Sequence, residues 1–189
     1  MQRLKQGYKA YQEAIHQNSE KFLYPASKQQ EPHSMIISCC DSRVNPCQIF
    51  QAHAGEIFLY QNIAGHLPPP DSDSSIQTTA ALRFGIDNLH ITHLIFLAHT
   101  DCAGLKAATQ NYRTLDPDLK KWLKKLKSLP AHNEIQLLQT HLRQNVQNAL
   151  SHAFVAEKVK KKRLFIHSMV YQVESGILLI DQDNQLIAF

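Results

Sequence analysis

The chain has 189 residues, of which 43% are hydrophobic and 19% charged, so we expect one folded domain and exclude a disordered chain. A chain of this length buries a core without disulfides or a structural metal, and any metal it holds is therefore expected to serve chemistry. The net charge of +4 is mildly basic, and its main run, residues 160–163, is better explained as a solvated helix end than as a nucleic-acid surface.

The first 24 residues are expected to form a helix, because Leu4, Tyr8, Tyr11 and Ile15 follow one another at steps of three or four residues. We interpret residues 1–24 as a helical arm that packs on a neighbouring molecule or on the rest of the chain. The segment has no apolar stretch of signal-peptide length, and no run elsewhere approaches the ~20 apolar residues of a membrane span. We therefore expect a cytoplasmic protein without a membrane partner.

Residues 25–189 are expected to form one α/β domain. Short apolar runs predict buried strands at residues 34–40, 56–61, 92–102 and 163–172, and Gly176 marks a turn into an edge hairpin or fifth strand. Helices are expected at residues 75–90 and over most of residues 103–153, where Pro117 and Pro130 divide them. Strands that alternate with helices and are buried on both faces are typical of a mainly parallel sheet flanked by helices.

Two of the predicted strands end in residues that bind metals in proteins. The first runs into Cys39-Cys40-Asp41-Ser42-Arg43, and the third runs into His99-Thr100-Asp101-Cys102. Because the carboxyl ends of neighbouring parallel strands lie at the same edge of a sheet, these segments are expected to meet. The chain has four cysteines, at positions 39, 40, 47 and 102. In a reducing compartment such spacing indicates metal or nucleophile chemistry and not a disulfide framework.

His99 and Cys102 are separated by two residues, so one tight turn can direct both side chains to one point. A cysteine from the first strand end would complete a Cys2His set, which suits zinc and leaves a fourth position for water. A single cysteine or histidine here would more simply be explained as a packed core residue. The occurrence of such residues at the ends of two neighbouring strands favours a metal site. Alternation along the strand places Cys39 on the side of Asp41, and of Arg43 if the chain stays extended, and turns Cys40 away into packing.

The residues around these positions resemble the β-class carbonic anhydrases. Ser-Cys-Cys-Asp-Ser-Arg-Val, at 38–44, is similar to the family motif C-x-D-x-R, and Ala-His-Thr-Asp-Cys-Ala-Gly, at 98–104, is similar to H-x-x-C. Segments 55–65 and 165–178 resemble two further strands of the family, so the likeness extends over residues 25–183. On these motifs the chain is identified as a member of that family.

The resemblance implies a parallel four-stranded sheet with an added edge strand, assembled as a homodimer or a dimer of dimers in which the N-terminal helix contacts the partner. It implies one zinc ion per chain on Cys39, His99 and Cys102, and a catalytic pair formed by Asp41 and Arg43. The implied reaction is the reversible hydration of carbon dioxide to bicarbonate and a proton. A zinc-bound hydroxide, oriented by Asp41, would attack, while Arg43 keeps that carboxylate off the metal.

The resemblance also suggests where substrate binds. The family's pocket residues fall on Val44, Phe58, Ile63 and Phe84, and Gln30 matches an amide that contacts substrate in one subgroup. Sequence alone would read these four apolar residues as ordinary core and Gln30 equally well as a surface residue.

Four positions depart from the family pattern. Ala98 and Ala103 replace glycines beside the ligands, and Gln61 and Gly65 stand where arginine and asparagine are usual. The extra methyl groups are expected to crowd the cavity and put the turnover rate in doubt. With Ile36 and Gln61 at positions that hold inhibitory bicarbonate in one subgroup, we predict a site that stays open at alkaline pH.

Three other readings compete with this one. The first is a catalytically weak or silent relative that binds zinc and serves a regulatory role, although such proteins usually lose Asp41 or Arg43. The second is an enzyme with Cys40 or Cys102 as nucleophile and His99 as base. The third is a nucleic-acid-binding module built on residues 160–163, which would bind in a strongly salt-dependent way.

Overall fold

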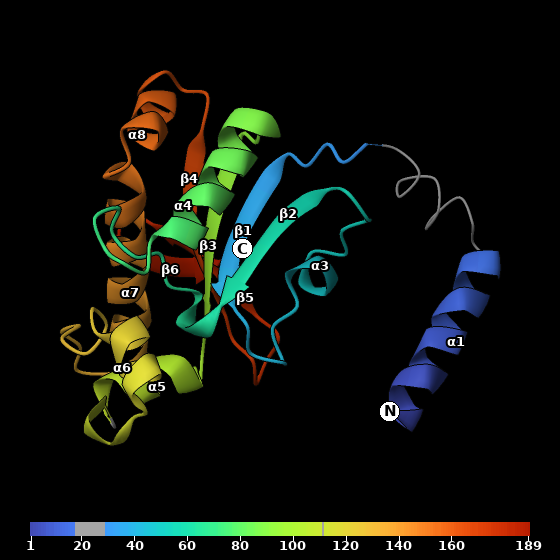
Figure 1. Cartoon of the computed structure of the whole chain (residues 1–189), viewed down its shortest axis with the longest axis horizontal. Helices are drawn as coiled ribbons and strands as arrows, with labels where there is room; N and C mark the ends of the chain where they lie inside the picture. Colours follow the sequence, from blue (N-terminus) through green and yellow to red (C-terminus); the bar gives the residue numbers. More distant parts are fainter. Residues whose placement is uncertain (18–28, 111) are drawn as a thin grey trace.

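The structure is a computed structural model that describes residues 1–17, 29–110 and 112–189. A twisted sheet lies at the centre of the folded domain, and the helices other than α1 lie beside it (Figure 1). The strands are β1 (Ser34–Cys39), β2 (Ile57–Asn62), β3 (His93–His99), β4 (Phe165–Tyr171), β5 (Leu178–Gln182) and β6 (Gln185–Ala188). The α-helices are α1 (Gln2–Gln17), α3 (Pro46–Ile49), α4 (Ile76–Arg83), α5 (Ala103–Thr109), α6 (Pro117–Leu123), α7 (Glu134–Leu150) and α8 (Ala153–Lys160). Short helical turns occupy Ile63–Gly65, Phe84–Asn88 and Tyr112–Thr114.

The strands lie in the order β2-β1-β3-β4-β5-β6. The first four are mutually parallel, whereas β5 and β6 form an antiparallel hairpin on the edge at β4. The predicted mainly parallel α/β sheet is confirmed, and its added edge consists of two strands. Because β1 lies between β2 and β3, the carboxyl ends of β1 and β3 are neighbours, as the strand-end argument requires.

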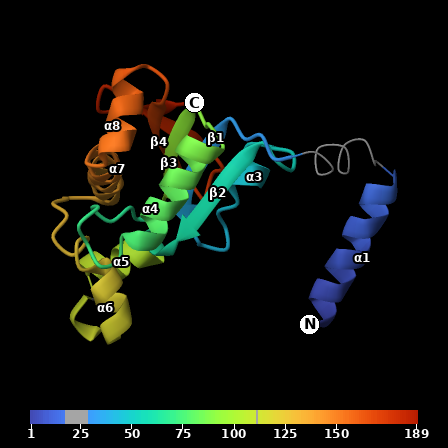
Figure 2. The same ribbon diagram turned by 45° about the horizontal axis from the view of Figure 1, so that its top comes forward.

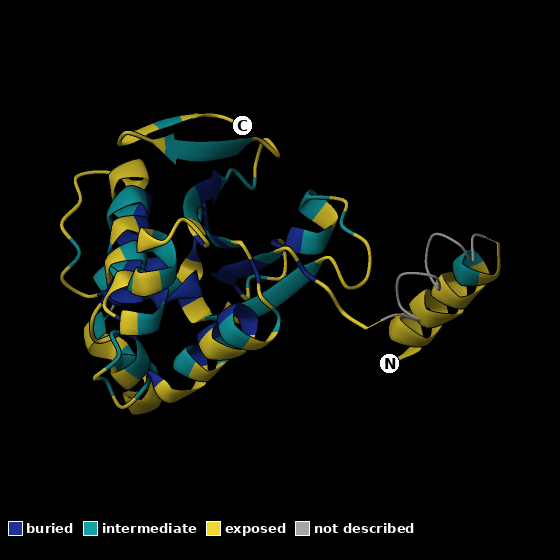
Figure 3. Cartoon of the chain, turned by 90° about the horizontal axis from the view of Figure 1, so that it is seen from above, coloured by how far each residue is buried: buried dark blue, intermediate teal, exposed yellow. Residues whose placement is uncertain are grey.

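Alternation along the central strands divides the core into two apolar clusters, one on each face of the sheet. Met35, Ile37 and Cys39 of β1 belong to the larger cluster, which is covered by residues of α4 to α8. Ile36 belongs to the smaller cluster, to which α3 contributes. The central strands β1 and β3 are mostly buried, whereas β5 and β6 at the edge are not (Figure 3). Cys39 and Cys102 therefore lie on the side of the sheet that the helices cover.

Side chains at the helix ends explain several boundaries. Asp116 accepts a hydrogen bond from Asp118 N and is followed by Pro117, which begins α6. Asn133 caps α7 by accepting from Gln136 N. The prolines thus divide the segment into separate helices, as expected. Residues 160–163 are exposed at the end of α8, so the predicted solvated helix end is also confirmed.

Helix α1 stands apart from the sheet in two views (Figures 1 and 2). It has no buried residue, and Leu4, Tyr8 and Tyr11 are 71%, 61% and 52% exposed. The predicted N-terminal helix is present over Gln2–Gln17, while the end of the predicted arm, residues 18–24, lies outside the described residues. Its contact with a partner stays a prediction. Within the described ranges, no helix is both long and apolar enough to cross a membrane.

Strands β1 and β3 both end earlier than expected. Strand β3 stops at His99 because Asp101 has a positive φ of 57°, which extended backbone does not allow. Strand β1 stops at Cys39, and Ser42 and Arg43 lie in a turn closed by a 2.9 Å hydrogen bond from Val44 N to the carbonyl of Asp41. The expectation that Cys40 packs inward is wrong, because at the end of the strand its side chain is exposed.

Candidate metal centre and its surroundings

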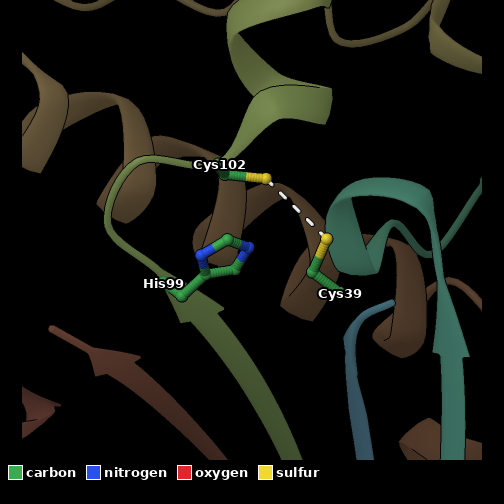
Figure 4. Close-up of side chains that lie close together, drawn as sticks. All are labelled: Cys39, His99 and Cys102. Carbon is green, nitrogen blue, oxygen red and sulfur yellow. Dashed lines mark hydrogen bonds between the residues drawn. The ribbon is translucent and has the colours of Figure 1, made fainter. Parts of the chain in front are cut away.

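Three buried side chains converge where β1 and β3 end (Figure 4). Cys39 is the last residue of β1, His99 is the last residue of β3, and Cys102 immediately precedes α5. One ligand atom from each lies within 4.8 Å of the other two. The three residues are 5%, 1% and 3% exposed. This is the predicted Cys2His set, and it is the only such group among the residues that the structure describes.

The ring of His99 is oriented by its own turn. Its Nδ1 lies 2.8 Å from the carbonyl oxygen of Thr100, which can only accept, so Nδ1 carries the hydrogen. Its Nε2 is buried and has no hydrogen-bond partner in the described part of the chain. Burial alone would lower the pKa of His99, but Cys39, the Thr100 carbonyl and Asp41 together outweigh burial and raise this pKa above its usual value. A buried, unpartnered nitrogen with a free lone pair is what a metal ligand presents.

The two thiols fit a metal by distance and by charge. Their sulfur atoms are 3.9 Å apart, and two sulfurs at about 2.3 Å from one tetrahedral zinc ion would be separated by about 3.8 Å. The Cys102 thiol donates to Cys39 and so lowers the pKa of Cys39. The pKa of Cys102 is raised by that same contact and by burial. One sulfur is therefore readily anionic, and a cation in place of the shared proton would ionise the other.

Asp41 and Arg43 form a bidentate pair beside this cluster. Arg43 Nε donates to Asp41 Oδ1 and Nη2 donates to Oδ2, both at 2.9 Å. The Arg43 backbone N–H also donates to Oδ1 at 3.0 Å. The turn, and not an extended strand, brings the two together. These bonds hold the pKa of Asp41 well below its usual range, and its Oδ2 lies 3.9 Å from His99 Nε2. An ionised carboxylate thus stands at the edge of the candidate metal site.

Asp101 joins the two strand ends. Its Oδ2 accepts from Arg43 Nη1 at 2.9 Å and its carbonyl accepts from Nη2 at 3.1 Å. Its other carboxylate oxygen bonds Lys106, and its N–H donates to Glu134 at 2.8 Å. Arg43 therefore bridges two carboxylates. In the sequence, Asp101 stands between two expected ligands, which is consistent with a turn or with a residue that supports the ligands, whereas nothing there indicates Glu134.

A family model described as carbonic anhydrase matches residues 34–178 of the chain. The chain belongs to the β-carbonic anhydrase family. Beta carbonic anhydrase 3 of Arabidopsis thaliana is 25% identical over 93% of this chain and 74% of its own length. The structure described as the β-carbonic anhydrase CcaA has a TM-score of 0.90 and 22% identity, and covers 100% of this chain and 99% of its own.

A further solved structure shares the fold. One of two tetrameric β-carbonic anhydrases of the ascomycete Sordaria macrospora has a TM-score of 0.79 at 22% identity, with 94% of this chain and 93% of its own covered. The architecture predicted from the β-carbonic anhydrase motifs is therefore confirmed over almost the whole chain.

The predicted β-carbonic anhydrase pocket residues divide between the two faces. Phe58 and Phe84 pack together with ring centroids 5.8 Å apart, and Phe58 contacts the cluster that contains Cys39. Ile63 and Phe84 are 41% and 44% exposed. Val44 is buried in the opposite cluster, with Ile36. Gln30 is exposed before β1. Their role in binding substrate stays a prediction.

Gly65 has a physical reason to replace the asparagine usual in the family. It adopts a positive φ of 58°, and a Cβ there would lie 2.9 Å from the backbone of Ser38 and Cys39. Any side chain would press on the end of the strand that carries Cys39. Ala103 is exposed at the start of α5, whereas Ala98 is buried in the cluster of Cys39 and Cys102.

Proposed function

We propose that this protein is a zinc-dependent carbonic anhydrase that interconverts carbon dioxide and water with bicarbonate and a proton. The observation that carries the proposal is the buried Cys39–His99–Cys102 cluster, whose unpartnered His99 Nε2 faces an ionised carboxylate 3.9 Å away. Membership of the family and the names of the relatives support the same reaction.

Cys39, His99 and Cys102 would hold zinc, which suits sulfur and nitrogen ligands. When bound, zinc acts as a Lewis acid that lowers the pKa of a water molecule towards neutrality. The two thiolates donate negative charge to the site, so this lowering is expected to be smaller than with three neutral histidines. The fit of the sulfur separation, 3.9 Å against about 3.8 Å, supports this assignment.

Asp41 would accept a hydrogen bond from the attacking water and turn its lone pair towards carbon dioxide. Because the bonds from Arg43 hold the pKa of Asp41 far below its usual range, the carboxylate accepts but does not keep the proton. The new carbon–oxygen bond then forms as the proton leaves to solvent. Arg43 restrains Asp41 through two parallel bonds, a geometry that a single point charge cannot give.

Carbon dioxide is small and apolar, so its binding requires apolar side chains near the cluster. Phe58 packs on the cluster of Cys39, Phe84 packs on Phe58, and Ile63 lies beside Gly104 of α5. The large exposed fractions of Ile63 and Phe84 leave room for a second chain to complete the pocket. We further propose a homodimer or dimer of dimers, because α1 has an exposed apolar stripe and related structures are tetrameric. A cytoplasmic location remains part of this proposal.

A stopped-flow assay with a pH indicator tests the proposed reaction. We expect zinc-loaded protein to hydrate carbon dioxide, metal-free protein to be inactive, and added zinc to restore the rate. A zinc-loaded protein without activity would favour a silent relative with a regulatory role. Alkylation tests the cysteine-nucleophile reading: zinc should protect Cys39 and Cys102 from iodoacetamide while the exposed Cys40 reacts, without loss of the hydration rate.

A further inference from the structure

The side chain of Gln61 crosses from β2 to the turn that follows β1. Its Nε2 donates to the carbonyl of Cys39 at 2.9 Å and to the carbonyl of Val44 at 3.2 Å. An amide nitrogen has two hydrogens, so both are used. The two acceptors stand on either side of the segment 40–43. One side chain therefore spans the segment that carries Asp41 and Arg43.

Among the described residues, this segment is also held by two backbone hydrogen bonds and by the bonds from Arg43 to Asp101. Cys40 N donates to the carbonyl of Asn62, and Val44 N closes the turn onto Asp41, both at 2.9 Å. The side chain of Arg43 is 43% exposed, and pairs of exposed charges restrain a chain weakly. Gln61, in contrast, ties two backbone carbonyls to β2, and so sets where the turn begins and ends relative to the ligand Cys39.

We propose that Gln61 is a positioning residue that binds both ends of segment 40–43 and so holds Asp41 and Arg43 at the edge of the candidate metal site. An arginine is usual here in the family. The neutral amide supplies two donors without adding a second cation next to Arg43. The kinetic part of the inference rests on the proposed function, whereas the structural part does not.

The test is Gln61→Met, which keeps the length of the side chain and removes both donors. A misplacement of about 1 Å in a catalytic group costs up to about 100-fold in rate, and we expect kcat to fall about tenfold. Because Gln61 holds the turn and does not touch substrate, KM should change by less than about twofold. Zinc content should stay at the unaltered level, which separates positioning from loss of the metal site.

Gln139→Met is the matched control. Gln139 lies on α7, and its Nε2 also donates to a backbone carbonyl, that of Asn184 in the β5–β6 turn, at 3.3 Å. The kcat of the Gln139→Met variant should match that of the unaltered protein. Gln61→Glu gives a second replacement of similar size that faces the same two carbonyls with oxygen, and it should lose at least as much activity. It keeps the test decisive if the methionine variant does not fold.

An unchanged kcat in a folded Gln61 variant would overturn the inference, and so would an equal loss in Gln139→Met. If the unaltered zinc-loaded protein shows no hydration, the proposed function fails instead. A crystal structure of Gln61→Met then decides the inference alone. A shift of Asp41 by about 1 Å relative to Cys39 supports the positioning role, and an unmoved turn refutes it.

Discussion

The same apolar core encloses two groups of polar side chains, and they use their polar atoms differently. In the first, Cys39, His99 and Cys102 direct three ligand atoms to one point, and His99 Nε2 has no protein partner among the described residues. In the second, His141 and Asn145 of α7 bond the loop after β2. His141 Nε2 contacts the carbonyl of Ala64 at 2.8 Å, and Asn145 contacts Gly65 and Leu67 at 2.9 and 3.0 Å.

The difference separates a functional group from a structural one. The α7 group satisfies backbone groups of a loop in which Ala64 and Gly65 both have positive φ, and so it stabilises a costly conformation. The ligand group leaves His99 Nε2 unsatisfied among the described residues, which costs free energy unless something else binds there. His141 Nδ1 of the α7 group is also buried without a described partner, but among the described residues it belongs to no group of three converging ligand atoms. The convergence of three ligand atoms, rather than burial, residue type or a missing partner alone, identifies the candidate metal site.

The largest effect is expected when the ligand group loses a member. Cys39→Ser should lose most of its zinc, and with it about 100-fold or more of the hydration rate, because a serine hydroxyl is a poor ligand at neutral pH. Cys40→Ser is the neighbouring control and should keep both, since the Cys40 side chain is exposed. Elemental analysis of the two purified variants measures the contrast. Zinc loss in Cys40→Ser instead would mean that the strand register is wrong.

Arg43→Ala tests the edge of the ligand group. We expect a fall of about 100-fold in kcat with zinc retained, because Asp41 loses both parallel bonds and its fixed orientation. Arg43→Lys should recover only part of the rate, since an ammonium group cannot supply the planar fork. Kinetics and zinc analysis on the same samples test this prediction, and nearly normal turnover in Arg43→Ala would contradict the role of the pair.

His141 of the α7 group and its neighbour His66 are buried histidines, and they predict that stability depends on pH. Burial lowers the pKa of His66 to about 3 and of His141 to about 4, whereas both titrate near ~6.5 when unfolded. Between about pH 6.5 and 4 the unfolded chain therefore takes up protons that the native chain excludes, and stability falls on acidification.

Replacing one histidine isolates this effect. His141→Gln retains an amide donor for Ala64 but cannot titrate. For each pH unit of acidification, the unfolding constant of the variant should therefore rise about tenfold less than that of the unaltered protein. Urea unfolding of both zinc-loaded proteins at several pH values between 7 and 5 gives the comparison, in which the contribution of the metal site cancels. Identical slopes would show that His141 is not held neutral by burial.

The smallest effect is expected for Asp101→Asn. Asparagine also tolerates positive φ, so the turn should persist, but Arg43 loses its second anionic partner. We expect kcat to fall about threefold, because ion pairs this exposed contribute little. Asp87→Asn, which removes an exposed partner of Arg83 elsewhere, should leave kcat unchanged. A loss as large as that of Arg43→Ala would make Asp101 part of the catalytic pair.

The ligand group could be predicted from the sequence because the carboxyl ends of β1 and β3 are neighbours and one turn carries both His99 and Cys102. The α7 group could not, since His141 and Asn145 read locally as polar helix residues and their partners lie 77 to 80 positions away. The exposure of Cys40 was also missed. The end of a strand depends on the turn that follows, and that turn is set by side-chain bonds that periodicity does not reveal.

Zinc-edge anomalous diffraction from crystals grown above about pH 8 tests the comparison most directly. We expect one peak per chain at Cys39, His99 and Cys102, with Asp41 still paired to Arg43 and beyond coordination distance. A peak at His66 and His141 would contradict the distinction between the two groups. An Asp41 oxygen at ~2.0–2.2 Å from the metal would contradict the open site.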